Sequence, residues 1–161
     1  MNAANEQKIA SLICSARNKF RELISEIEKK GYNVLVTSSH RSNESQKKLI
    51  AAGGSVKPAK PGKSLHNHGV AIDINLKKGD QLWKKATPKQ EWVDTGIPKL
   101  AKDLGFRWGG EFNNNYDPVH FDMGNNYKVN ELSELVSKGK ESFSQQFSCF
   151  VEDTFGKFLK K

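Results

Sequence analysis

The chain has 161 residues, a formal net charge of +8 at pH 7, and 36% hydrophobic against 27% charged residues. That length suits one domain with a single core, and the hydrophobic fraction excludes a chain that is disordered throughout. No apolar run approaches the roughly 20 residues that a membrane-spanning helix needs, so we expect none. The basic charge predicts attraction to polyanions, such as nucleic acid, anionic lipid or an anionic wall polymer, without choosing among them.

The N-terminal residues and the cysteines bear on the compartment. MNAANEQK lacks the basic start and the apolar centre of a signal peptide, from which we expect a protein that is made in the cytoplasm and not exported through such a leader. Cys14 and Cys149 are far apart and have no metal-type spacing. We therefore expect two free thiols without a functional role.

The first part of the chain predicts a helix, a strand and a second helix in that order. Apolar residues recur at helical spacing over residues 9–27 and are followed by a basic turn and a glycine, which predicts one amphipathic helix. YNVLVTSS, residues 32–39, has the short β-branched pattern of a buried strand. The second half of residues 39–53 predicts a helix that ends at a Gly-Gly pair, and a loop rich in Gly, Pro and Lys follows.

Two later strands are predicted to carry metal-capable side chains away from the core. In residues 70–75, apolar side chains alternate with small or polar ones, which places Asp73 on the polar face. A lysine-rich polar segment and a short helix that begins at an Ile-Pro pair come next. In the strand that ends at Asp122, the same alternation turns His120 and Asp122 to one face.

The stretch SLHNHGVAID, residues 64–73, concentrates polar groups of the kind that bind metal. Hydrolytic zinc sites use three protein ligands, from His and from Asp or Glu, and keep one position open for water. A seven-residue step from His66 to Asp73 reverses the face of a strand, so the chain must turn near Gly69 if both bind one ion. On residue type and spacing alone, the candidate ligands are His40, His66, His68, Asp73 and His120.

Four segments resemble motifs of one known family. SLHNHGVAID is similar to the S-x-H-x-x-G-x-A-x-D pattern of the D-alanyl-D-alanine carboxypeptidase and L-alanyl-D-glutamate peptidase family of zinc peptidases, and DPVHFD, residues 117–122, resembles its second motif. VTSSHRSNESQKKL is similar to the strand-end motif of the family, and GFRWGGEF resembles the segment before the second motif. The resemblance covers roughly residues 18–124 in the order of the family.

The resemblance implies a fold and a division of the chain. The fold expected is α+β, a small antiparallel sheet with flanking helices of the hedgehog and D-Ala-D-Ala peptidase type. We expect a single catalytic domain over residues 1–161, with a catalytic core at about 18–124 and a C-terminal helical extension over 125–161. That extension holds five of the nine phenylalanines, and its aromatic face either packs on the domain or contacts a wall or membrane.

The resemblance also implies roles for individual residues. His66, Asp73 and His120 are the expected zinc ligands, and Asp117 is the expected catalytic acid and base. Arg41 offers a permanently charged fork for a carboxylate or for developing negative charge. The expected substrate-binding or supporting residues are Ser38, Arg41, Gln46, Ser64, His68 and Trp108, with packing as the alternative for His68 and Trp108.

The expected function is a zinc-dependent peptidoglycan endopeptidase that cuts the L-alanyl-D-glutamate bond, with a zinc-activated water as nucleophile. Relatives that cleave D-Ala-D-Ala commonly have glutamate at the position of Asp117, whereas the phage endolysin branch typically has Asp-Pro. A D-Ala-D-Ala carboxypeptidase or dipeptidase and a non-catalytic zinc-stabilised wall-binding module remain alternatives.

The resemblance and the charge together suggest where the protein works. We expect a monomeric endolysin that resides in the host cytoplasm and acts on peptidoglycan of the periplasm or cell wall after release. Its basic surface is expected to contact an anionic membrane or wall. Nucleic acid is not an expected partner because the sequence has no recognisable nucleic-acid motif.

Overall fold

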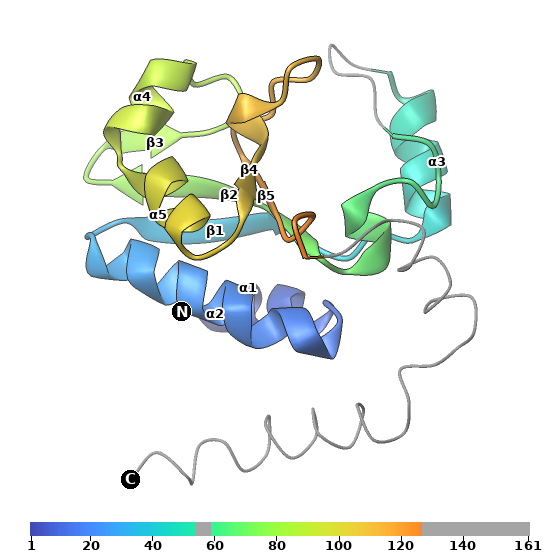
Figure 1. The fold of residues 1–161 in the computed structure, drawn as a ribbon, viewed down its shortest axis with the longest axis horizontal. Helices are drawn as coiled ribbons and strands as arrows, with labels where there is room; N and C mark the ends of the chain where they lie inside the picture. The colour runs from blue at the N-terminus through green and yellow to red at the C-terminus, as the bar shows by residue number, and fades with distance from the viewer. Residues whose placement is uncertain (54–58, 127–161) are drawn as a thin grey trace, which may run out of the picture.

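A computed structural model describes residues 1–53 and 59–126 of the chain. These residues form a five-stranded sheet with helices around it (Figure 1). This arrangement confirms the expected α+β class with a small antiparallel sheet. In chain order the elements are α1 (Ala3–Ala10), α2 (Cys14–Lys29), β1 (Asn33–Ser38), α3 (Asn43–Ala51), the 3-10 turn η1 (Leu65–His68), β2 (Ala71–Lys78), β3 (Gln81–Trp83), α4 (Lys89–Asp94), α5 (Ile97–Asp103), β4 (Arg107–Trp108), the 3-10 turn η2 (Gly109–Glu111) and β5 (His120–Asp122).

The sheet has the order β1-β2-β5-β4, all antiparallel, and β3 also pairs with β2. Because side chains alternate along a strand, this register gives the sheet one apolar and one polar face. Ile72 pairs with Phe121 on the apolar face, and Asp73 pairs with His120 on the polar face. The polar face is therefore where two sequence-distant, metal-capable side chains meet.

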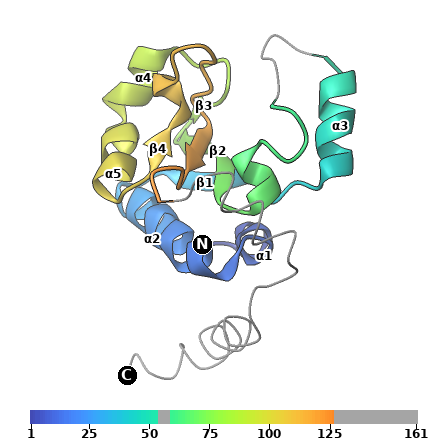
Figure 2. The same cartoon turned by 45° about the vertical axis from the view of Figure 1, so that its right-hand side comes forward.

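Helix α2 packs against the apolar face of the sheet. Phe20, Leu23, Ile24 and Ile27 recur at helical spacing, and each is fully buried. The ring of Phe20 lies 4.8 Å from that of Phe106, which joins α2 to the segment before β4. Both ribbon views show α1 and α2 along one side of the sheet and α3 standing apart (Figure 2).

The single helix expected over residues 9–27 is wrong at its start, because α1 ends at Ala10 and α2 begins at Cys14. Ile13 has extended backbone angles, φ −63° and ψ 150°. Its N–H donates to the carbonyl of Gly69 at 3.1 Å. Leu12, in the break, is still buried, so the apolar spacing continues through a point where the helical hydrogen bonds do not.

The outer edge of β1 is bound by a side chain. Asn5 of α1 is fully buried, its Nδ2 donates to the carbonyl of Val34 at 2.8 Å, and its Oδ1 accepts from the N–H of Val36 at 2.9 Å. One amide thus satisfies two main-chain groups that an edge strand otherwise leaves open.

On its other side, β1 is irregular next to the polar face. The pairing with β2 shifts between Val36 and Ser38, so that Ser38, rather than Thr37, is the partner of Asp73. Such a bulge re-aims side chains near functional sites. Here it places Ser38 beside Asp73.

Further expectations have mixed outcomes. The strand predicted at 70–75 is present and extends to Lys78, and the polar segment after it contains β3 and α4, which the sequence did not predict. Cys14 is disulfide-bonded, so the expectation of a free thiol there is wrong. Cys149 and the expected extension over 125–161 lie outside the described residues, apart from 125 and 126.

Among residues 1–53 and 59–126, no helix combines the length and the apolar character that crossing a bilayer requires.

Candidate metal centre

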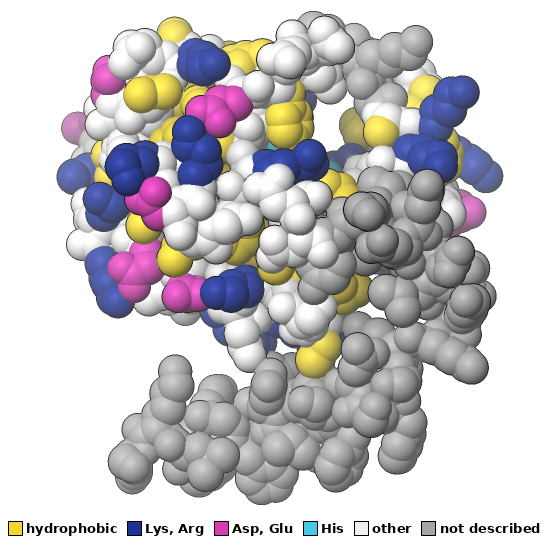
Figure 3. Space-filling view, viewed as in Figure 1, with side chains coloured by type: hydrophobic (Ala, Val, Ile, Leu, Met, Phe, Trp, Pro, Cys, Tyr) yellow, Lys and Arg dark blue, Asp and Glu magenta, His cyan; other side chains and the backbone are white. Residues whose placement is uncertain are grey.

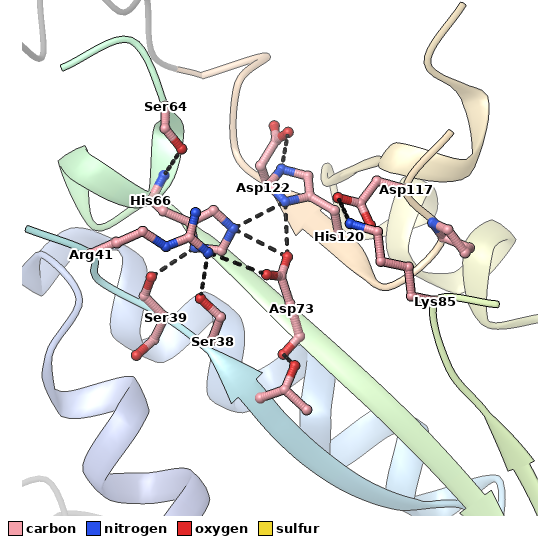
Figure 4. A network of polar contacts seen from close by, with 12 residues as sticks. Ser38, Ser39, Arg41, Ser64, His66, Asp73, Lys85, Asp117, His120 and Asp122 are labelled. Atoms are coloured by element: carbon pink, nitrogen blue, oxygen red, sulfur yellow. Dashed lines mark hydrogen bonds and ion pairs between the residues drawn. The ribbon is translucent and has the colours of Figure 1, made fainter. Parts of the chain in front are cut away.

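Three side chains from separate elements converge on the polar face of the sheet (Figure 4). His66 comes from η1, Asp73 from β2 and His120 from β5. Nε2 of His66, Oδ1 of Asp73 and Nδ1 of His120 are each 3.1 Å from the other two. The structure thus brings together the three residues that the resemblance implies as zinc ligands.

Local capping explains how His66 and Asp73 reach the same point. Ser64 begins η1, and its Oγ accepts from the N–H of His66 at 3.3 Å. Gly69 ends η1 in the left-handed region, with φ 65° and ψ 29°, where a residue without a Cβ is favoured. The turn that the seven-residue spacing requires is therefore present at Gly69.

In each histidine, the ring nitrogen that points away from the cluster, here called the distal nitrogen, faces a hydrogen-bond acceptor. Nδ1 of His66 is 2.7 Å from the carbonyl oxygen of Ser39, and Nε2 of His120 is 3.0 Å from Oδ2 of Asp122. Because these oxygens accept hydrogen bonds, they fix a proton on the distal nitrogens and leave lone pairs on Nε2 of His66 and Nδ1 of His120.

The chemistry of this donor set fits a divalent metal. Two ring nitrogens with lone pairs and one carboxylate oxygen, all 3.1 Å apart, repel one another unless a cation lies among them. Two nitrogens and one oxygen are a ligand set that zinc uses in hydrolytic sites. Distal nitrogens that donate to a carbonyl or a carboxylate are common around ligating histidines.

Without metal, a proton offsets part of this repulsion. Burial lowers the pKa of His120, but hydrogen bonds to Asp122 and Asp73 outweigh it and raise the pKa to about 9. Burial raises the pKa of Asp73, and the hydrogen bonds of His120 and His66 more than reverse this, so the carboxyl has a pKa far below its usual range. A cation that enters the site must therefore displace a proton from His120 below pH 9.

Arg41 lies next to this cluster and is held in place from two sides. Its Nη2 donates to Oγ of Ser38 at 2.9 Å, and its Nη1 donates to Oε1 of Gln46 at 3.0 Å. Gln46 is buried, and its Nε2 donates to the carbonyl of Ala59. With Nη2 also 3.7 Å from Oδ2 of Asp73, the guanidinium is a fixed positive charge at the edge of the cluster.

Asp117 lies near the cluster but is not one of its three converging side chains. Its N–H donates to the carbonyl of Gly109 at 3.0 Å, and a Cβ on Gly109 would lie 2.4 Å from the carbonyl oxygen of Asp117, so only glycine fits there. Oδ2 accepts from Nζ of Lys85 at 3.4 Å, whereas Oδ1 is buried with no hydrogen-bond partner. A buried carboxylate oxygen without a partner can accept a hydrogen bond from a bound molecule.

These groups line one groove of about 490 Å³. Lysine and arginine side chains are prominent on the face of the molecule around this hollow (Figure 3). The charged residues in its lining are Arg41, Lys63, Asp73, Lys85, Arg107, Asp117 and Asp122. Phe112 and Leu49 add apolar surface, so the groove combines charged and apolar walls.

Other predicted site residues lie outside the groove lining. His68 is buried, and its Nε2 bonds to the carbonyl of Gly62. Trp108 is buried, and its Nε1 donates to the carbonyl of Pro118 at 2.8 Å. His40 is exposed and stays apart from the metal-capable cluster of the described residues.

Sequence reasoning assigned no role to several groups that shape the site. The carbonyl of Ser39 leaves no sequence signal, since every residue has one. Asp122 was placed on the face of His120 by strand alternation, but its contact with His120 was not predicted. Lys85 and Arg107 come from segments that only the folded chain brings to the groove.

Sequence comparisons point to one family. Residues 58–123 match a family model described as D-alanyl-D-alanine carboxypeptidase. The chain is also 34% identical over 106 residues to the peptidoglycan L-alanyl-D-glutamate endopeptidase CwlK of Bacillus subtilis (strain 168). That match covers 58% of this chain and 62% of CwlK, so the chain spans less than two thirds of this relative.

Comparison with solved structures shows the same fold. The L-Ala D-Glu endopeptidase ChiX of Serratia marcescens has a TM-score of 0.54 at 18% identity, over 76% of this chain and 87% of ChiX. VanYB, solved in complex with D-alanine-D-alanine, has a TM-score of 0.51 at 18% identity, over 78% of this chain and 76% of VanYB. Residues 58–123 are therefore similar to the D-alanyl-D-alanine carboxypeptidase family.

Proposed function

We propose that this protein is a zinc-dependent endopeptidase that hydrolyses the L-alanyl-D-glutamate bond of peptidoglycan stem peptides. The observation that carries the proposal is the convergence of His66, Asp73 and His120 in one groove with Asp117 and Arg41. The similarity to CwlK, whose name gives this bond, supports the choice of substrate.

His66, Asp73 and His120 would hold the metal ion. When bound, zinc supplies a Lewis acid that polarises a carbonyl and lowers the pKa of a water molecule towards 7. The side chains otherwise keep their positions through contacts that exist without the metal, such as the bond of His66 to the carbonyl of Ser39.

Asp117 is the proposed proton carrier. Its buried Oδ1 takes a proton from the water that attacks the scissile carbonyl carbon. As the bond between that carbon and the peptide nitrogen breaks, Asp117 returns the proton to the leaving amine, so that a carboxylate and an amine are released. Lys85, 3.4 Å from Oδ2, keeps a positive charge beside the carboxylate through this cycle.

Arg41 is the proposed anchor for negative charge. Ser38 and Gln46 fix the plane of its guanidinium, so little side-chain freedom is lost when it meets an anion. Stem peptides carry carboxylates, and the scissile carbonyl oxygen becomes negative as water adds. Both are suitable partners for Arg41.

The biological setting is a further part of the proposal. We infer an endolysin that acts as a monomer, waits in the host cytoplasm and reaches peptidoglycan at host lysis. The Asp-Pro pair at 117–118, a pattern typical of the phage-lysin branch, and the net charge of +8 support this assignment. Addition of the purified protein to permeabilised bacteria, with turbidity as the readout, tests the lytic role.

One alternative keeps the chemistry and changes the bond. The matching family model is described as D-alanyl-D-alanine carboxypeptidase, which favours release of terminal D-Ala as the second candidate activity. The two activities leave different products, so a single product analysis separates them.

The decisive experiment is digestion of purified peptidoglycan, with new amino termini identified by mass. New D-Glu amino termini that disappear in Asp117→Ala and after chelation support the endopeptidase. Free D-Ala supports the carboxypeptidase, and stem peptides that begin with L-Ala point to cleavage of the amide to the glycan. Wall binding without any product would contradict both peptidase assignments and favour a binding module.

A further inference from the structure

Asp122 is a fully buried carboxylate whose contacts all come from donors. Oδ1 accepts from Nε of Arg107 and from the N–H of Gly124, both at 2.7 Å. Oδ2 accepts from Nη2 of Arg107 at 3.0 Å and lies 3.0 Å from Nε2 of His120. Each carboxylate oxygen thus faces two hydrogen-bond donors, and the plane of the carboxylate is fixed.

The guanidinium of Arg107 also lies against Gly124 and Phe112. A Cβ on Gly124 would lie 2.4 Å from Cζ of Arg107, so the guanidinium occupies space that any other residue would fill. The ring of Phe112 lies 5.5 Å from the same guanidinium and 5.8 Å from the ring of His120. If Arg107 moved away from Asp122, it would therefore lose its contacts with Gly124 and with the ring of Phe112.

We propose that Asp122, locked by Arg107 and Gly124, is a positioning residue that makes His120 present the lone pair of Nδ1 to the metal. Because Oδ2 accepts only, Nε2 of His120 must carry a proton, and Nδ1 is then free to ligate. This inference rests on the proposed metal site. It adds to the three ligands a fourth residue, Asp122, which orients one of them.

The other histidine provides an internal reference. His66 is oriented by the carbonyl of Ser39, a main-chain group that no side-chain substitution removes. A change at Asp122 should therefore disturb His120 and leave the distal proton of His66 in place. A general loss of structure would disturb both histidines.

Replacing Asp122 by asparagine tests the orientation directly. The amide group of asparagine must replace one of two oxygens, and each oxygen now faces two donors. If the amide faces His120, Nε2 becomes the acceptor and its proton moves to Nδ1, which then cannot bind metal. If the amide faces Gly124 and Nε of Arg107, its N–H groups meet two other donors, and the hydrogen bonds that fix the side chain at position 122 are lost.

The experiment measures zinc affinity by competition with a chromophoric chelator, for the full chain and three variants. Asp122→Asn is expected to bind zinc about 10- to 100-fold more weakly than the wild type. Asp103→Asn is the matched control, since Asp103 is an exposed aspartate whose partner is Lys99, and its affinity should equal that of the wild type. Arg107→Lys keeps the charge but loses the fork, and a smaller loss of about three- to tenfold is expected.

A nuclear magnetic resonance spectrum of the zinc-loaded proteins provides the second readout. In the wild type, the Nε2–H of His120 and the Nδ1–H of His66 should both exchange slowly with water. In Asp122→Asn only the signal of His120 should shift or disappear. If Asp122 served only to hold Arg107, the melting temperature of the metal-free protein would fall while zinc affinity and both signals stayed unchanged.

Each outcome decides the proposal. Wild-type zinc affinity in Asp122→Asn would overturn it, while weaker binding with a changed His120 signal supports it. If Asp122→Asn does not fold, the Arg107→Lys variant tests the proposal instead. Wild-type zinc affinity in that variant would overturn the claim that Arg107 fixes Asp122. A wild type that binds no zinc overturns the proposed metal site as well, which distinguishes the two failures.

Discussion

Asp73 and His120 are direct partners across the antiparallel strands β2 and β5, with Oδ1 and Nδ1 3.1 Å apart. Their neighbours Ile72 and Phe121 are also paired, on the opposite face and in the core. A slip of β5 by one residue against β2 would therefore turn His120 towards the core and Phe121 towards the polar face. The packing of the core thus fixes the register of the site.

Removal of metal should abolish hydrolysis and lower stability together. Binding to the native state alone stabilises it by about 4 kcal/mol when free ligand is about 1,000 times its Kd. We expect the melting temperature to fall after dialysis against a chelator and to recover with one equivalent of zinc. Calorimetry and product assays on the same sample check this, and full activity in a verified metal-free sample would contradict the proposed mechanism.

Asp117→Asn should separate chemistry from metal binding. Asparagine keeps the size of the side chain but cannot take up a proton, so hydrolysis should slow about 100- to 10,000-fold. Zinc content should stay at the wild-type level, because Asp117 is not among the three converging ligands. Asp80→Asn, in the exposed turn between β2 and β3, is the control, and comparable rates in the two variants would remove Asp117 from the mechanism.

Arg41→Lys should weaken the use of an anionic substrate without loss of metal. Lysine retains the charge but cannot donate to Ser38 and Gln46 in the same plane. We expect kcat/KM to fall about 10- to 100-fold, which corresponds to the roughly 1.5–3 kcal/mol of a hydrogen bond to a charged group. Steady-state kinetics alongside zinc affinity tests this, and unchanged kcat/KM would show that Arg41 has a structural role only.

The metal-free protein should lose stability at alkaline pH. The pKa of His120 is raised from an ordinary 6.5 to about 9, so its contribution is complete below pH 6.5 and disappears as the pH rises through 9. The effect is on the order of 3 kcal/mol. The pKa of Asp73 and that of Asp122 are lowered, so their contributions are lost instead as the pH falls below about 3.8.

Urea unfolding of the metal-free protein over this pH range measures the effect. Stability should be greatest between about pH 4 and pH 6.5, within the limits that these pKa shifts set. The zinc-loaded protein should not show the alkaline loss, because the metal replaces the proton on His120. A flat profile between pH 6 and pH 10 without metal would show that folding does not raise the pKa of His120.

Gly69→Ala should destabilise the fold and the metal site together. A Cβ there would lie 2.9 Å from the backbone nitrogen of Ile13, and φ is +65°. We expect a loss of about 2 kcal/mol or more from strain and the clash. Gly79→Ala is the control, because Gly79 also has a positive φ, +58°, but no atom lies within 4 Å of an added Cβ. Its loss of unfolding free energy should be about 1 kcal/mol. Equal losses in denaturant unfolding would show that contact with Ile13 is unimportant.

The sequence predicted the parts of the fold that a regular period determines. Alternation along residues 70–75 placed Asp73 on the polar face, and the odd spacing from His66 required the turn at Gly69. The break between α1 and α2 was not predictable, because Leu12 keeps the apolar spacing and the hydrogen bond of Ile13 goes to a residue far along the chain. β3 and α4 are too short for a period to stand out.

The candidate site divides in the same way. Residue types and the family resemblance pointed to the side chains that converge. The groups that orient them depend on tertiary pairing: the carbonyl of Ser39 follows the end of β1, and Arg107 reaches Asp122 only because β4 lies beside β5. Orientation by main-chain groups or by distant side chains leaves little trace in one sequence.

The amide of Asn5 affects how the molecule behaves at high concentration. An edge strand with free N–H and C=O groups invites a strand from another copy, which is one route to aggregation. Asn5 occupies the carbonyl of Val34 and the N–H of Val36, while the neighbouring Leu35 is 52% exposed. A small residue at position 5 would leave these two main-chain groups open beside an exposed apolar side chain, so this one amide closes that part of the sheet edge.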